Sequence, residues 1–157
     1  MMQNDTIRTA LEEQFNRSQK MLDAVLHAYP AEEWQRGDLA YLRPAGLAYH
    51  LVETIDFYIS DLPGDRFAWG SLGSDWETPD SAALPGQEQV LDYLARVNAR
   101  LETWLAATDF LAPETVYPWT GASVLSRAMY LLRHCQHHVA ELYLELTRRG
   151  LPCPEWE

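Results

Sequence analysis

Four long stretches of this 157-residue chain repeat apolar residues in steps of three and four, the spacing of one face of an α-helix. They cover about residues 5–29, 44–61, 86–108 and 122–150. Nothing between them alternates apolar and polar residues as a strand ladder does. Four amphipathic helices bury their apolar faces most simply against one another. The sequence therefore predicts an all-α fold, and more specifically a four-helix bundle that forms a single domain over residues 1–157.

Proline and glycine mark the ends of the expected helices. Pro30 ends the first, Pro44 suits the first turn of the second, and Gly150 followed by LPCP ends the fourth. The second and third helices are joined by residues 62–85, a stretch rich in glycine, proline, aspartate and serine. Such a link is much longer than a usual helix–helix connection. We expect it to be a crossover loop along the bundle, with the second and third helices roughly parallel, and to shape a substrate pocket.

The charge and the cysteine content of the chain exclude several functions. A formal net charge of −11 argues against nucleic-acid binding, which needs a surplus of lysine and arginine on one face. It argues equally against a polybasic contact with a membrane. No apolar run approaches the ~18 residues that span a bilayer, and the first residues do not resemble a secretory signal. Cys135 and Cys153 are too few for a disulfide scaffold. In the absence of contrary signals we expect a cytoplasmic protein.

Histidines of the second and fourth helices are the candidate metal ligands. In the motif RHCQHHVAEL, residues 133–142, His134 and His138 are four residues apart and lie roughly 40° apart on one flank of a helix. His50 flanks the apolar face of the second helix in the same way. Taken singly, each could be a core-edge histidine, but a pair on one helix and a third on another is how helical bundles build metal sites. His137 points to nearly the opposite face and is expected at the surface.

Three charged residues near these histidines have open roles. Glu53 lies one turn after His50, and Glu141 lies one turn after the second histidine of the fourth-helix pair. Each could orient a ligand or act as a general base, or could be a surface carboxylate that is solvated or in a salt bridge. Arg127 could bind an anionic substrate, with a surface ion pair as the simpler alternative. The catalytic residue therefore stays open.

Aromatic residues of the two irregular stretches could belong to a pocket. Trp69 and Trp76 lie in the long loop, and Tyr117 and Trp119 come just before the fourth helix. They could wall a pocket above an open metal position. The alternative is that they plug the ends of the bundle, as aromatic side chains in loops often do.

Two helical motifs and the end of the chain resemble the DinB-like family, within the wider DinB/YfiT-like superfamily. They are GLAYHLVETIDFYI in the second helix, LLRHCQHHVAELYLEL in the fourth and the closing RGLP. The resemblance implies a bundle of four helices and a divalent metal ion held by His50, His134 and His138. Homodimers are frequent in the family, although the sequence leaves the oligomeric state open. Zinc or nickel suits ligation by imidazoles alone. Some members of the family are S-transferases that use a low-molecular-weight bacterial thiol, and related members are metal-dependent hydrolases or isomerases.

We therefore expect a divalent-metal-binding protein that is a metal-dependent thiol S-transferase or hydrolase acting on a small molecule. A bound ion would lower the pKa of water or of a thiol and so produce a nucleophile at neutral pH. The alternative is a non-enzymatic metal-binding or dimerising stress-response bundle. The sequence leaves the substrate, the native metal and the thiol open, and it leaves open whether the protein is an enzyme.

Overall fold

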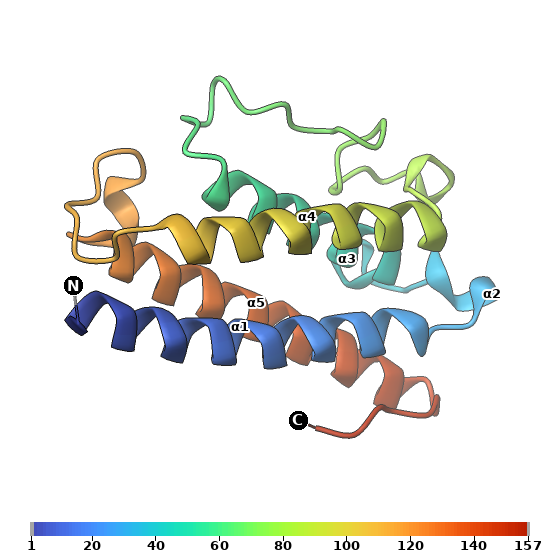
Figure 1. Cartoon of the computed structure of the whole chain (residues 1–157). Coiled ribbons are helices and arrows are strands. Elements are labelled where there is room, and N and C mark those ends of the chain that lie inside the picture. Colours follow the sequence, from blue (N-terminus) through green and yellow to red (C-terminus); the bar gives the residue numbers. More distant parts are fainter. Residues whose placement is uncertain (1, 157) are drawn as a thin grey trace.

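The computed structural model describes residues 2–156, and those residues form helices and no β-strand (Figure 1). The predicted all-α class is confirmed. Four helices are long and α2 is short, and three single turns of 3-10 helix lie in the connections. The elements are α1 (Met2–His27), α2 (Ala31–Trp34), η1 (Ala40–Leu42), α3 (Pro44–Ile59), η2 (Ser81–Ala83), α4 (Gln87–Ala107), η3 (Pro118–Thr120) and α5 (Val124–Arg148). None of the helices in this described range is long and apolar enough to span a membrane.

The long helices lie where the apolar spacing predicts them, although their ends differ from the expected ones by up to three residues. Helix α1 ends at His27 rather than at Tyr29, because the residue before a proline is disfavoured in the helical region. Helix α5 begins at Val124 rather than near residue 122, because the Ser123 hydroxyl caps it by accepting a hydrogen bond from the Ser126 N–H. Helix α2 has only four residues, too few to produce a periodic pattern.

Each long helix packs against two others. Helices α4 and α5 both contact α1 and α3, and these four pairings are the main helix contacts. The core between them is apolar and tightly filled. Its largest fully buried side chains are Tyr49, Tyr117, Phe15, Phe110, Leu22, Leu26, Leu47, Leu51, Ile55, Leu94, Leu131 and Leu142.

Helix α3 is the most enclosed of the four. Every residue of α3 except His50 is buried. The reason is that α4 and α5 cover two of its sides and the connection between α3 and α4 covers more. In Figure 1 this connection runs back along the helices from the end of α3 to the start of α4, so that α3 and α4 point the same way. His50 is thus the one position at which α3 opens towards solvent.

Candidate metal centre

The structure brings the rings of His50, His134 and His138 together, although 84 residues separate His50 from His134 in the sequence. The ring of His50 on α3 lies 5.3 Å from that of His134 and 4.9 Å from that of His138, measured between centroids. The two rings on α5 are 4.5 Å apart. One ring nitrogen from each of the three lies within 4.8 Å of the other two. The arrangement could hold a metal ion between α3 and α5.

Burial keeps these imidazoles neutral. Loss of solvent, together with the neighbouring histidines, lowers the pKa of His50 from 6.5 to about 3 and that of His134 to about 4. Burial also lowers the pKa of His138, while the Glu141 carboxylate acts in the opposite direction. A neutral imidazole has a free lone pair, and that is the form that binds a metal ion. The site therefore offers three ligands at neutral pH without first losing protons.

A polar atom without a partner gives a direct test of whether a metal ion fits. The Nε2 atom of His134 is buried and has no hydrogen-bond partner within the described part of the chain. Buried polar atoms nearly always have a partner. An ion shared with the other two rings would supply one, and three imidazoles suit zinc or nickel. The residues therefore fit the ion that the family resemblance implies.

Glu141 contacts His138 through the Nδ1 atom of the ring. Its Oε2 atom lies 2.7 Å from Nδ1 of His138, and its Oε1 atom lies 3.4 Å from Nε2 of His137. The first contact occupies Nδ1 of His138 and leaves Nε2 available as a ligand. The side chain of His137 is 66% exposed, which agrees with its expected place at the surface. Glu141, His137 and His138 also lie close enough to form a second possible cation group, but this group includes that exposed ring.

The long loop covers His50 through Trp76. The indole of Trp76 lies over the His50 ring with centroids 4.2 Å apart and planes tilted by 33°. Gly46, one turn before His50, permits this approach, since a Cβ atom at this position would come within 2.9 Å of the Trp76 carbonyl oxygen. Trp69, by contrast, packs on Phe57, at 4.8 Å between centroids. Of the two loop tryptophans, Trp76 therefore walls the histidine cluster.

Glu53 neither contacts a candidate metal ligand nor lies at the surface. It is 3% exposed, so the interpretation as a surface carboxylate is wrong. Its carboxylate accepts hydrogen bonds from the Tyr49 hydroxyl and from the backbone N–H groups of Gly70 and Ser71. Burial raises its pKa, and these donors oppose the rise. The Tyr49 hydroxyl in turn accepts from the N–H of Leu72. Glu53 and Tyr49 thus fasten the long loop to α3 a few residues before Trp76.

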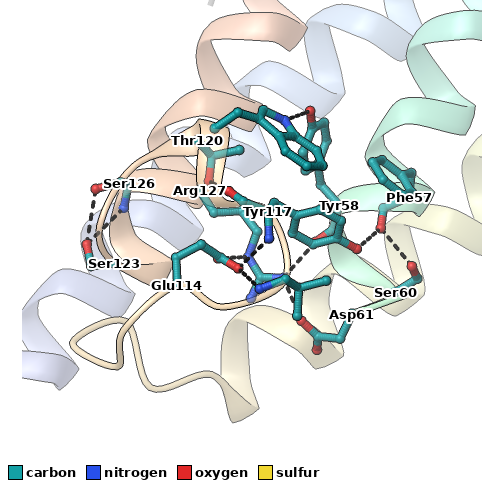
Figure 2. Close-up of polar contacts among 12 residues, drawn as sticks. Phe57, Tyr58, Ser60, Asp61, Glu114, Tyr117, Thr120, Ser123, Ser126 and Arg127 are labelled. Atoms are coloured by element: carbon teal, nitrogen blue, oxygen red, sulfur yellow. Dashed lines mark hydrogen bonds and ion pairs between the residues drawn. The ribbon is translucent and has the colours of Figure 1, made fainter. Parts of the chain in front are cut away.

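Arg127 is also buried, and its charge is already paired (Figure 2). It is 4% exposed, and its guanidinium forms ion pairs with Glu114, at 3.0 Å, and with Asp61. Arg127 therefore forms the predicted ion pair, but it does so in the interior and not at the surface. Its positive charge is already compensated, which leaves none for an anionic substrate. Tyr117 is buried and donates a hydrogen bond to the Phe57 carbonyl, which supports the interpretation that it plugs this end of the molecule.

Fold and site together define a class: a helical protein whose partly buried histidine cluster could bind a metal ion. A family model for the DinB superfamily matches residues 14–142. The match covers most of the chain and includes all three histidines, and the chain therefore belongs to the DinB superfamily. A comparison with curated proteins gives no match.

Proposed function

We propose that this protein binds one divalent metal ion, zinc or nickel, through His50, His134 and His138. We further propose that it uses the ion as a thiol S-transferase or hydrolase acting on a small molecule. The observation that carries the proposal is the convergence of three ring nitrogens within 4.8 Å. Three protein ligands leave a position on a zinc ion open, as catalytic sites require.

A divalent ion held in this way supplies Lewis acidity, which lowers the pKa of water or of a thiol towards neutrality. The chain's own residues prepare the site for it. Burial holds His50 and His134 in the neutral form, and Glu141 fixes which nitrogen of His138 is available. Trp76 covers one side of His50 and limits the access of water there. The substrate would enter beside this indole.

Metal analysis of matched histidine variants tests the ligand assignment. We expect the purified protein to contain about one equivalent of zinc or nickel, and His134→Ala to lose it while keeping its helical circular dichroism. His137→Ala is the control, because it removes an exposed imidazole from the same helix. If His134→Ala keeps its metal, or if His137→Ala loses it equally, the assignment is wrong.

Turnover decides between an enzyme and a metal-binding protein without catalytic activity. We expect the metal-loaded protein to transfer a low-molecular-weight thiol to a small electrophile, or to hydrolyse a small amide or ester, and the chelated protein to do neither. If both reaction panels are silent in the metal-loaded protein, the enzymatic part of the proposal fails and the metal site remains.

The remaining parts of the proposal rest on the sequence and on the family resemblance. The four long helices would form a four-helix bundle in which residues 60–86 are the crossover, as their course in Figure 1 suggests. The working form would be a cytoplasmic homodimer without nucleic-acid or membrane partners, in keeping with the acidic charge of −11. Light scattering of the purified protein checks the dimer, and salt-dependent DNA binding would contradict the choice of partners.

A further inference from the structure

A groove of about 690 Å³ lies between α1 and α4, the helix pair that carries none of the three candidate metal ligands. The two helices contact each other and lie side by side in Figure 1. The groove is bounded by residues 12–23 of α1 and residues 98–105 of α4, and Phe15, Leu101 and Leu105 give it an apolar lining. Its volume is typical of sites for small molecules.

Three polar atoms, from the side-chain amides of Gln19 and Asn98, lack hydrogen-bond partners within the described residues. Gln19 lines the groove and is only 8% exposed. Neither its Nε2 nor its Oε1 atom has a hydrogen-bond partner within residues 2–156, and the same holds for the buried Oδ1 of Asn98 on the facing helix. Leaving buried amides unpaired is destabilising, and natural proteins avoid it. These three atoms have almost no solvent-exposed surface, so an occupant of the groove pairs with the two acceptors and the one donor group once the Gln19 and Asn98 side chains turn towards it.

The charges around the groove indicate the sign of the occupant. Three carboxylates, from Glu12, Asp23 and Glu102, line it together with one ammonium, from Lys20. Negative charge therefore exceeds positive charge, and the additional amide oxygens are also acceptors. A ligand that matches these groups carries N–H donors and a positive charge. It also carries one oxygen that can accept from Nε2 of Gln19.

We propose that this groove is a second binding site, for a small organic cation with an apolar body and one oxygen acceptor. Its N–H groups donate to the Gln19 and Asn98 oxygens and to the carboxylates at the rim. Its apolar body packs on the Phe15 side of the groove. The inference is independent of the metal centre, because none of the three histidines takes part in it.

A titration with three matched probes tests the proposal on the full-length, zinc-loaded protein. The probes are 4-hydroxybenzamidine, 4-hydroxybenzamide and 4-hydroxybenzoate, which share ring and hydroxyl but are cationic, neutral and anionic. In ¹⁵N-correlated spectra we expect the cation to shift the Gln19 side-chain amide and backbone amides of residues 12–23 and 98–105. We expect a Kd of about 1 mM for so small a probe. The neutral probe should bind about tenfold more weakly, and the anion not at all.

Three variants separate recognition from folding. Gln19→Leu keeps the volume and removes the unpaired amide, so it should melt at the same temperature as the parent or higher and bind the cation about tenfold more weakly. Glu102→Gln should weaken binding, whereas Asp92→Asn, an equal charge change on an exposed α4 residue outside the groove, should not.

Three results would overturn the proposal. Equal binding of the three probes would show that charge plays no part in recognition. Shifts confined to the surroundings of His50, or no shifts at ~10 mM cation, would show that the groove is no site for such ligands. A dimer that buries these α1 and α4 residues would show that a second copy of the chain is the occupant.

Discussion

The Nδ1 atom of His138 lies 2.7 Å from Oε2 of Glu141, one turn further along α5. A carboxylate in this position accepts the Nδ1–H proton and selects the tautomer whose Nε2 lone pair is free. It also raises the basicity of the ring, against the lowering of its pKa by burial. In the proposed three-histidine site, Glu141 would therefore position a metal ligand rather than bind the ion itself.

Removing this carboxylate should weaken metal binding without abolishing it. We expect Glu141→Ala to lower the zinc affinity by about 10-fold to 100-fold. Glu141→Gln should lose less, because its amide oxygen can still accept a hydrogen bond from the Nδ1–H group of His138. Competition with a fluorescent zinc chelator measures both affinities. His137→Ala, which removes the other partner of Glu141, should bind zinc like the parent. An unchanged affinity in Glu141→Ala would refute the positioning role.

The stability of the metal-free protein should fall as the pH drops below 6.5. The folded-state pKa values of His50 and His134, about 3 and about 4, lie below their ordinary value of 6.5. Between these pH limits the unfolded chain binds protons that the folded chain does not. The contribution of the two histidines to the free energy of unfolding is therefore fully present above pH 6.5 and is lost towards pH 4. Between pH 7 and pH 5, the free energy of unfolding measured with urea should fall by about 2 kcal/mol less in His50→Leu than in the parent. Parallel losses in the two proteins would contradict the lowered pKa of His50.

A methyl group at Gly46 should lift the long loop away from the histidines. The added Cβ would lie 2.9 Å from the Trp76 carbonyl oxygen, closer than packed atoms come. We expect Gly46→Ala to destabilise the fold by about 1–3 kcal/mol and to speed proteolysis within residues 62–85. Gly64→Ala is the control, since the nearest atom to its Cβ would be 3.9 Å away. If both variants are cut at the rate of the parent, Trp76 does not depend on this close approach.

Removing the Glu53 carboxylate should destabilise the long loop without changing metal binding. Glu53→Ala leaves the N–H groups of Gly70 and Ser71 and the Tyr49 hydroxyl without their acceptor, a loss of about 2–3 kcal/mol in the free energy of unfolding. Its zinc stoichiometry should stay at that of the parent. Glu77→Gln, an exposed carboxylate of the same loop, should change neither quantity. Loss of zinc from folded Glu53→Ala would instead place Glu53 in the metal site.

The spacing of apolar residues predicted most of the helical architecture. Apolar residues spaced three and four apart located α1, α3, α4 and α5, because each long helix buries one stripe in a shared core. The same periodicity placed His134 and His138 on one flank of α5 and His50 on the equivalent flank of α3. Their convergence followed because those flanks face each other across the contact between α3 and α5.

What the sequence could not predict depends on the path of irregular segments. Glu53 is buried only because residues 70–72 fold back onto α3, and no periodic signal encodes that path. Arg127 is buried for the same reason, since Glu114 and Asp61 reach it from two separate connections. Gly46 offered the one available hint: a glycine inside an apolar helix, four residues before a candidate ligand, is typical of a close approach by another backbone.

Anomalous scattering from a crystal of the protein as purified is the most direct test of the central claim. We predict a single strong peak at the zinc or nickel absorption edge, at about 2.0–2.1 Å from one nitrogen each of His50, His134 and His138. A peak elsewhere in the molecule would contradict the account. So would a crystal soaked in zinc in which the zinc fully occupies another set of ligands while these three rings bind none.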